Sequence, residues 1–388
     1  MKVLIVVNVA GFLYFLWNDI YILQSIGCEV SVAMNGRMPD GTEAPEIAKL
    51  NKKRIKHYQI DFDSKNPLAL ANRAAYLQLR QVLKNRYDII HCHTPIPGIL
   101  TRLAASKYRR KGTIVLYTTH GFTFTDRSSK KIWLIYYNAE SFMSRYCDAI
   151  ITINHEDYHN AKKMHCKKVF LLPSIGLDLR RFQNVRIDRN TYRKQFGVNE
   201  KDIMILAVGE LSLRKNHQII IKALSILPDK ERYVFVICGR ALGNSTIEGS
   251  LKQLAETLGV RVHLPGHRRD IPEVNRCADI AVIPSLREGF GMAGVEALAS
   301  GVPVIGSDVQ GIREYVIPGE TGYLCAPDSA QEFAEAIKKL TSLTDEERKI
   351  IASNCKKKAS EFDVEMSKQT MKNIYLNVIK NKNNNILH

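Results

Sequence analysis

The sequence has no paired cysteines and no long apolar run. Its eight cysteines stand singly, without the spacing of a zinc site or of a disulfide framework. The apolar stretch 3–17 is interrupted by Asn8 and Gly11, no small-residue cleavage site follows it, and no segment reaches the ~20 apolar residues of a spanning helix. We therefore expect neither secretion nor a transmembrane helix, and a reducing cytosol fits best.

Other common signals are also missing. The loop after the first predicted strand lacks the dinucleotide fingerprint G-x-G-x-x-G, which argues against an NAD(P) oxidoreductase. We find no solenoid-length repeat and no low-complexity segment. The chain has 388 residues, of which 45% are hydrophobic and 24% charged, so it is long enough for two or three globular domains.

Acidic residues are outnumbered, with 39 Asp and Glu against 56 Lys and Arg, a net charge of +17. Residues 1–181 alone carry +13 and the remainder +4. Anionic partners are expected, and the basic clusters at 107–111 and 127–131 are candidates for contact with an anionic membrane, although each alone is more typical of a solvated face. No basic stripe is interleaved with aromatic residues, so nucleic acid is not an expected partner.

Short β-branched runs alternate with longer amphipathic segments along the whole chain. This pattern predicts an α/β protein made of two doubly wound, Rossmann-like domains facing across a cleft, with ligands at the carboxyl ends of the strands. We place the first domain at 1–180, the second at 181–362 and a C-terminal helix, packing back on the first domain, at 363–388. The predicted strands are 2–7, 29–34, 88–91, 113–118, 149–153, 168–172, 203–208, 233–238, 260–264, 279–283 and 303–306.

The richest motif follows the predicted strand 279–283. It runs from Glu288 through Gly289, Phe290 and Gly291 into a helix that contains Glu296. Glycines at a helix N-terminus leave backbone N–H groups free to bind a phosphate, and a carboxylate accepts hydrogen bonds from the hydroxyls of a sugar or ribose. The alternative interpretation makes the first glutamate a partner of the helix dipole and the second a surface residue.

This motif, with the Ala-x-Gly-x-Pro-Val-Ile that follows it, resembles the donor-site signature of the retaining GT-B glycosyltransferases of family 4. The segments 208–216, 119–122 and 173–182 resemble the family's phosphate loop, histidine loop and crossover segment. Segments 88–95 and 133–137 are similar to those of the capsular and exopolysaccharide branch. The resemblance covers nearly the whole chain and implies the GT-B fold.

The resemblance also implies roles for individual residues. Lys215 would contact the donor diphosphate, Glu288 the sugar hydroxyls and Glu296 the ribose. His120 would lie near the anomeric carbon, so the implied catalytic residues are Lys215, Glu288 and His120. The implied donor-binding residues are Gly209, Arg214, Lys215, His267, Arg268, Glu288, Gly289, Phe290, Gly291, Met292, Ala293 and Glu296, with the backbone around His267 and Arg268 holding the base.

Five positions near these motifs are open to more than one interpretation or depart from the family pattern. Many family members have Arg directly after the glycine of the phosphate loop, whereas this chain has Glu210. Arg214 is either the replacement cation or a solvent-facing residue. Gly11 is either part of an acceptor or phosphate loop or an ordinary strand-to-helix turn. His91 and His93 are expected in the core or lining the cleft, with no carboxylate spaced beside them as a metal site requires, and we expect no metal and no other cofactor.

The sequence thus predicts a retaining, UDP-sugar-dependent hexosyltransferase. Its donor would be a UDP-sugar, with an N-acetylhexosamine or related deoxy sugar transferred to a polyprenyl-diphosphate-linked saccharide in cell-surface polysaccharide synthesis. We expect it in the cytoplasm, peripheral at the inner face of the membrane. The alternatives are a UDP-sugar 2-epimerase of the same fold and a non-catalytic, membrane-bound assembly subunit.

Overall fold

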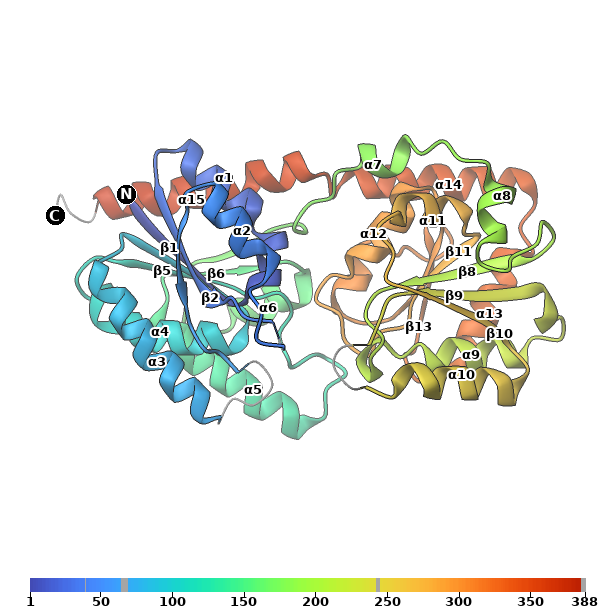
Figure 1. Cartoon of the computed structure of the whole chain (residues 1–388), viewed down its shortest axis with the longest axis horizontal. Helices are drawn as coiled ribbons and strands as arrows, with labels where there is room; N and C mark the ends of the chain where they lie inside the picture. The colour runs from blue at the N-terminus through green and yellow to red at the C-terminus, as the bar shows by residue number, and fades with distance from the viewer. Residues whose placement is uncertain (39, 64–68, 242–244, 385–388) are drawn as a thin grey trace. The chain divides into compact units, whose positions relative to one another are not determined.

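The structure is a computed structural model that describes residues 1–38, 40–63, 69–241 and 245–384, with side chains described as far as residue 380. The chain divides into two compact units. Unit 1 comprises Met1–Ile175 with Glu365–His388, and unit 2 comprises Gly176–Val364. Figure 1 shows a central sheet in each unit with helices on both of its sides.

Unit 1 is built on a parallel sheet with strand order β3-β2-β1-β4-β5-β6-β7. Helices α1, α2 and α15 cover one face and α3, α4 and α5 the other (Figure 1). The strands are β1 (Lys2–Val9), β2 (Glu29–Asn35), β3 (Lys56–Gln59), β4 (Ile89–His93), β5 (Ile114–Thr118), β6 (Ala149–Thr152) and β7 (Val169–Leu171). The helices are α1 (Trp17–Ser25), α2 (Pro45–Lys52), α3 (Leu70–Val82), α4 (Pro95–Arg109), α5 (Lys130–Met143), α6 (His155–Lys162) and α15 (Val364–Asn384).

Unit 2 repeats this architecture with strand order β10-β9-β8-β11-β12-β13, again all parallel. The strands are β8 (Ile203–Val208), β9 (Tyr233–Cys238), β10 (Arg261–Gly266), β11 (Ile280–Ile283), β12 (Val304–Ser307) and β13 (Gly322–Cys325). The helices are α7 (Arg180–Gln183), α8 (Arg189–Lys194), α9 (Gln218–Ile226), α10 (Ile247–Leu258), α11 (Ile271–Cys277), α12 (Met292–Ala299), α13 (Ala330–Thr341) and α14 (Asp345–Ser360).

The prediction of two doubly wound, Rossmann-like α/β domains is confirmed. Central strands such as β5 and β9 are buried at every position because helices cover both faces of the sheet, and this explains their nearly continuous apolar sequences. The strand order reverses between β1 and β4 in unit 1 and between β8 and β11 in unit 2. Loops diverge at such a point, and open α/β sheets bind ligands there.

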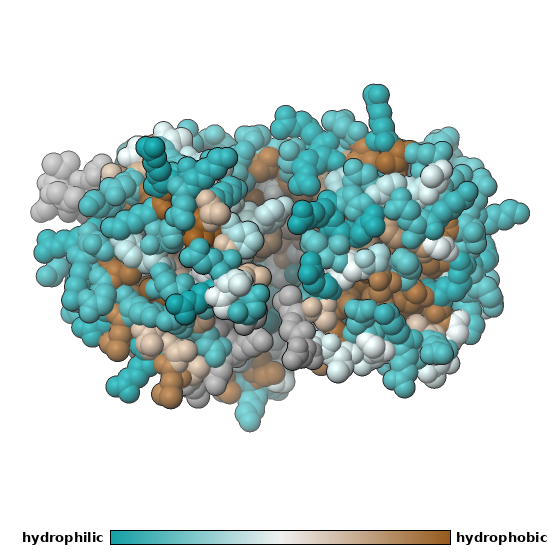
Figure 2. Space-filling model, viewed as in Figure 1, coloured by the Kyte–Doolittle hydropathy of each residue, from teal (hydrophilic) through white to brown (hydrophobic). Residues whose placement is uncertain are grey.

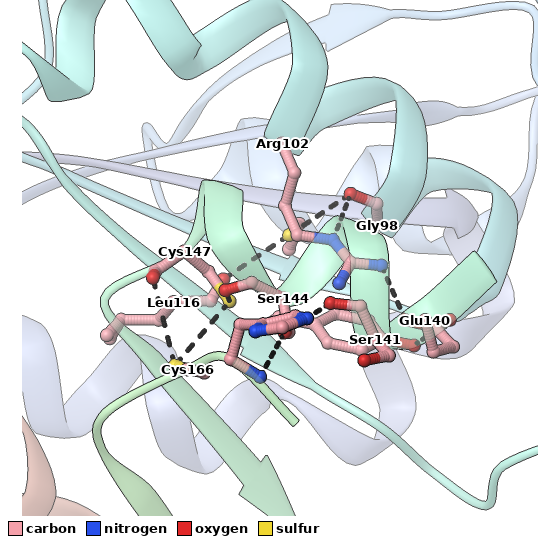
Figure 3. A network of polar contacts seen from close by, with 11 residues as sticks. Gly98, Arg102, Leu116, Glu140, Ser141, Ser144, Cys147 and Cys166 are labelled. Atoms are coloured by element: carbon pink, nitrogen blue, oxygen red, sulfur yellow. Dashed lines mark hydrogen bonds and ion pairs between the residues drawn. The ribbon is translucent and has the colours of Figure 1, made fainter. Parts of the chain in front are cut away.

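Beneath the sheet of unit 1, helices α4 and α5 are joined by a buried ion pair (Figure 3). The Arg102 guanidinium donates to the Glu140 carboxylate at 2.8 Å and to the Gly98 carbonyl at 3.0 Å. It also lies 4.0 Å from the ring centre of Tyr117, whose hydroxyl donates to Glu140 at 3.2 Å. A Cβ atom on Gly98 would come within 2.6 Å of that ring, so only glycine fits there.

We predict that Arg102→Met destabilises the protein by about 3–5 kcal/mol, because it leaves Glu140 buried without its counter-ion. The double variant Arg102→Met/Glu140→Leu should regain most of this loss, because neither charge then remains in the apolar core. Thermal and urea unfolding of both variants measure the effect. Equal destabilisation in the single and double variants would contradict this account.

Candidate active site

Two loops of unit 2 meet where its strand order reverses. The loop after β8 carries Lys215, and the loop after β11 carries Glu288. The Lys215 ammonium lies 2.5 Å from Glu288 Oε2, although 73 residues separate the two in sequence. The Ser285 hydroxyl donates to the same oxygen at 3.1 Å. The adjacent pairing of β8 and β11 therefore places a cation and a carboxylate at the predicted ligand edge of the sheet.

The charge state of Glu288 is set by its neighbours. Burial opposes its ionisation, but the positive charges of Lys215 and Arg214 outweigh burial and hold the pKa of Glu288 below its ordinary value. The side chain is 13% exposed, so it lies at the surface of the site while its negative charge stays compensated. At neutral pH Glu288 is a carboxylate, able to accept hydrogen bonds from ligand hydroxyls.

Arg214 faces the same carboxylate but is less tightly held. Its guanidinium lies 3.4 Å from Glu288 and donates to the Arg287 carbonyl at 3.2 Å, with 40% of the side chain exposed. Its own carbonyl accepts a 2.9 Å hydrogen bond from the Leu286 amide, which joins the two loops. Arg214 thus points toward the Lys215–Glu288 pair, as a replacement for the cation missing at Glu210 would.

The turn into α12 is tightly packed around glycine. Gly291 precedes the helix with φ +81°, and a Cβ atom there would lie 2.9 Å from the Tyr315 hydroxyl and 3.0 Å from Glu288 Cγ. Gly294 lies still closer, since a Cβ atom would be 2.4 Å from the same tyrosine. The Tyr315 hydroxyl donates to the Gly291 carbonyl at 3.0 Å. These glycines thus allow the tyrosine to brace the turn, and the N-cap residue of the helix that follows is itself a glycine.

Glu296 projects from α12, and its environment differs from that of Glu288. Burial raises the pKa of Glu296 to about 7, and only the more distant charge of Arg181 opposes this effect. The two glutamates of the motif are therefore unlike, one a compensated carboxylate and the other a carboxyl group that titrates near neutrality. A hydroxyl-bearing ligand would serve Glu296 as a hydrogen-bond partner.

The remaining predicted donor residues lie in the same unit. Gly209 directly follows β8 and has φ +150°. Its carbonyl packs closely against Gly239, where an added Cβ atom would lie only 1.7 Å from the Gly209 oxygen. His267 is exposed at the end of β10. The Arg268 side chain pairs with Asp270 at 2.5 Å and lies over the Phe196 ring at 5.3 Å, so it leaves the backbone of this loop as the candidate contact for a base. Gly289, Phe290, Met292 and Ala293 complete the α12 turn.

In unit 1, three histidines gather at the carboxyl ends of β4 and β5. His120 Nε2 lies 3.2 Å from His93 Nδ1, and burial lowers the pKa of His120 to about 4. The His120 ring also meets the Phe12 ring edge-on at 4.7 Å. His91 contacts the Tyr375 hydroxyl at 2.8 Å and that of Thr118 at 2.7 Å. His91 is thus a core residue, whereas His120 lines a cavity of about 20 Å³.

Sequence reasoning missed Asp19, which lies beside these histidines. One carboxylate oxygen of Asp19 and one nitrogen each of His91 and His93 lie within 4.8 Å of one another. Both nitrogens of His91 already have hydrogen-bond partners, so the group offers a metal ion at most two uncommitted ligands. The signal available in the sequence was a carboxylate within the apolar helix that follows the first strand.

Two further sequence features have local roles. Contrary to our expectation of a sequence without an Asp-x-Asp motif, the triplet Asp61-Phe62-Asp63 follows β3. The Asp61 carboxylate accepts hydrogen bonds from Gln59 at 2.8 Å and from Gln78 at 2.7 Å, so it ties an edge turn together. Gly11 is exposed in the 3-10 helix Ala10–Phe15, and a Cβ atom on it would meet no other atom within 4 Å. Its predicted contact with phosphate or acceptor stays a prediction.

Comparison with known proteins agrees with this geometry. Residues 23–174 match the family model "Glycosyltransferase Family 4", and residues 188–358 match "Glycosyl transferases group 1". The chain is 35% identical to the putative glycosyltransferase EpsD of Bacillus subtilis over 93% of its own length and 91% of that protein. The chain is a family 4 glycosyltransferase.

Other relatives of this glycosyltransferase have more specific names. It is 29% identical to the UDP-Gal:alpha-D-GlcNAc-diphosphoundecaprenol alpha-1,3-galactosyltransferase of Escherichia coli, over 77% of this chain and 78% of that enzyme. Among solved structures, Anabaena Alr3699/HepE in complex with UDP and glucose superposes with a TM-score of 0.78 at 22% identity, covering 97% of this chain and all of that one. The glycosyltransferase therefore has the GT-B fold, as predicted.

The contrast between the two motif glutamates leads to a prediction for this glycosyltransferase. The folded-state pKa of Glu296, about 7, lies above the ordinary value of 4.5. The contribution of protonated Glu296 to the free energy of unfolding is therefore fully present below pH 4.5, and it is lost as the pH rises through 7. We predict that Glu296→Gln stabilises the protein by about 2 kcal/mol more at pH 8 than at pH 5.

Unfolding curves at the two pH values check this prediction. Glu288→Gln is the matched control. Its carboxylate has a lowered pKa, so the variant should be less stable than wild type at neutral pH, a deficit that disappears only in acid. A pH-independent effect of Glu296→Gln would show that Glu296 is not a buried titrating group.

Proposed function

We propose that this glycosyltransferase transfers an N-acetylhexosamine or related deoxy sugar from a UDP-sugar to a hydroxyl of a lipid-linked saccharide, with retention at the anomeric carbon, in cell-surface polysaccharide synthesis. The observation that carries the proposal is the Lys215–Glu288 ion pair at the carboxyl ends of β8 and β11. The name of the Escherichia coli relative specifies a UDP-linked donor and a diphosphoundecaprenol-linked acceptor, and so supports both substrate classes.

In this proposal the donor is held by unit 2. The Lys215 ammonium and the Arg214 guanidinium stabilise the charge that develops on the leaving diphosphate, together with the amides of the α12 turn. Glu288 accepts hydrogen bonds from the hydroxyls of the sugar, and Glu296 from those of the ribose. Lys215 serves both groups, because its ammonium has three donors and Glu288 accepts only one of them.

The leaving of UDP gives the sugar oxocarbenium character, and the acceptor hydroxyl then attacks the same face of the anomeric carbon. The diphosphate takes the electron pair of the broken bond, and a diphosphate oxygen on the same face accepts the proton of the attacking hydroxyl. Since the cations at 214 and 215 are side chains of the protein, the proposal assigns no metal to the diphosphate. Unit 1 binds the acceptor, with His120 next to the reacting sugar.

The test is a transfer assay with a panel of UDP-, GDP- and dTDP-sugars and a polyprenyl-diphosphate-linked saccharide, with the anomeric configuration of the product read by NMR. We expect turnover with a UDP-sugar and an α-linked product from an α-linked donor.

We predict that Lys215→Ala lowers turnover about a hundredfold or more, because it removes a charge-assisted contact with the leaving group.

Lys222→Ala provides the control, because it deletes an exposed lysine of α9 in the same unit. Near-wild-type transfer by a normally folded Lys215→Ala protein would contradict the proposed site. Calorimetry that detects no binding of any UDP-sugar would favour the non-catalytic assembly subunit instead.

A lipid-linked acceptor requires access to the membrane, and α5 of unit 1 has a suitable surface. No described helix is long and apolar enough to cross a bilayer. Leu134 is 58% exposed and Ile135 56%, and the exposed Lys130 and Lys131 begin the same helix. Figure 2 shows how apolar residues interrupt the largely hydrophilic surface. We propose that α5 binds peripherally to the anionic inner face of the membrane, which makes the enzyme cytoplasmic and membrane-associated.

The other basic cluster, at 107–111, is less suited to this role. Arg109 pairs with Asp148 at 2.9 Å and donates to the Arg145 carbonyl at 3.2 Å, so its charge is already used within unit 1. The ammonium groups of Lys130 and Lys131 form no ion pair with any residue that the structure describes. We propose charge-driven docking for the cluster at 127–131, because it leads into the helix that exposes Leu134 and Ile135.

We predict that Lys130→Gln/Lys131→Gln weakens binding to anionic liposomes, because each lysine near the surface contributes about 1 kcal/mol. The measurement is co-sedimentation at low and high salt, with binding expected to fall as salt screens the charges. Lys356→Gln/Lys357→Gln on α14 is the control with the same loss of charge. If the two double variants bind equally well, α5 is not the docking surface.

A further inference from the structure

The strand order of unit 1 also reverses, between β1 and β4, and there His120 lies close to two polar groups that the transfer mechanism above does not use, Asp19 and His93. Asp19 lies on α1 after β1, His93 ends β4, and His120 follows β5. All three line the cavity of about 20 Å³, which is large enough for a single water molecule. Apolar side chains, among them Leu16 and Ile22, form much of the remaining wall.

The three groups form a chain with one gap. His93 Nδ1 and His120 Nε2 are 3.2 Å apart and share a proton in a hydrogen bond. His93 Nε2 is buried and has no hydrogen-bond partner among the described residues. A carboxylate oxygen of Asp19 lies within 4.8 Å of a ring nitrogen of His93, and no direct hydrogen bond is described between the two side chains. A water in the cavity would bridge this gap and satisfy the buried nitrogen.

Both imidazoles in this chain are neutral at physiological pH. Burial lowers the pKa of His120 to about 4, and burial together with the neighbouring histidines holds the pKa of His93 well below its usual range. A neutral imidazole has one N–H and one lone pair. The hydrogen bonds from Asp19 to His120 can therefore run in either of two directions. These differ in whether His120 presents an N–H or a lone pair at Nδ1.

We propose that ionised Asp19 sets the direction of this chain, through one water and His93, so that His120 carries its proton on Nε2 and presents a hydrogen-bond-accepting lone pair at Nδ1. A carboxylate only accepts, so the water donates to Asp19 and accepts from His93 Nε2–H. His93 Nδ1 is then a lone pair and accepts from His120 Nε2–H. Asp19 is thus a positioning residue that acts through His93.

The consequence for transfer rests on the proposed function. A His120 that accepts at Nδ1 can hold a substrate hydroxyl by its proton, whereas a His120 that donates there would bind the hydroxyl oxygen instead. The direction of the chain therefore determines which end of an O–H group this histidine recognises.

The groups that face Asp19 come from three elements besides its own. β4 contributes His91 and His93, the loop after β5 contributes His120, and α15 contributes Tyr375 and Lys368. The Lys368 ammonium pairs with Glu365 at 2.7 Å. The described part of the chain thus gives Asp19 no ion-pair partner, and burial raises its pKa to about 7. Protonated Asp19 can donate a hydrogen bond, so below that pH the direction of the hydrogen bonds from Asp19 to His120 can reverse.

The experiment is ¹⁵N NMR of the full-length protein labelled at histidine, with His120 assigned by comparison with His120→Gln. In wild type at pH 8 we expect His120 protonated at Nε2, and a shift toward the Nδ1-protonated form as the pH falls through about 7. In Asp19→Asn, which cannot titrate, the His120 signals should lose this pH dependence. In Asp19→Leu, which can neither donate nor accept, the preference for Nε2 should be lost.

Tyr375→Phe is the matched control. It removes a buried hydroxyl that contacts His91 and leaves the Asp19–His93–His120 chain intact, so the His120 tautomer should not change. A wild-type His120 protonated at Nδ1 at pH 8 would overturn the proposal. So would identical His120 signals and pH dependence in wild type and Asp19→Asn.

This readout needs no substrate, so it separates the inference from the proposed function. Absence of transfer by wild type, with the NMR result as expected, would overturn the proposed function alone. With a working transfer assay, Asp19→Leu should lower kcat at least tenfold at pH 8 and leave KM for the donor unchanged. Normal transfer by Asp19→Leu would contradict the role of the His120 tautomer in catalysis.

Discussion

Both sheets of this protein are entirely parallel and covered by helices on both faces, and this constraint determines where its chemistry can occur. Side chains along the central strands are buried, so charged and hydrogen-bonding groups gather at the strand ends. Where the strand order reverses, neighbouring loops diverge and leave space for a ligand. Lys215 and Glu288 lie at this point in unit 2, and Asp19 and His93 at the corresponding point in unit 1. The same topology thus places an ion pair in one unit and a cluster of buried histidines beside a buried carboxyl group in the other.

Packing limits the site as strongly as charge does. Glycine-rich turns before helices are usually associated with access for a phosphate, and the turn before α12 has the expected form. Here the same glycines are required by the protein itself, because Tyr315 occupies the space that their Cβ atoms would need. Glu288 is therefore held by the packing of the turn as well as by Lys215. A ligand would meet a carboxylate whose position and charge are both fixed before it arrives.

Much of this organisation could be predicted from the sequence. The central strands are apolar and β-branched, so the α/β class and the doubly wound domains followed, and the loops that carry Lys215, Glu288 and His120 were correctly placed after strands. One edge strand of each sheet was missed, whereas the other two edge strands, β7 and β10, were predicted. β3 has the sequence Lys-His-Tyr-Gln and β13 the sequence Gly-Tyr-Leu-Cys, and neither is covered well enough to require an apolar pattern. The sequence could not predict which side chains lie together either. Asp19, for example, belongs to no motif and lies near the histidines only because of the order of the strands.

Helix α15 returns the last part of the chain to unit 1 after the whole of unit 2 has been completed. Its Tyr375 hydroxyl contacts His91, a residue 284 positions earlier, and its Met371 lines the cavity beside His120. During synthesis the amino-terminal part of the chain leaves the ribosome first, yet it lacks one wall of its own cavity until the final helix emerges. Domains commonly mature in the order in which they are translated. In this protein the unit that begins first is finished after the other, so that its histidine cluster becomes complete only once the residues of α15 have been translated.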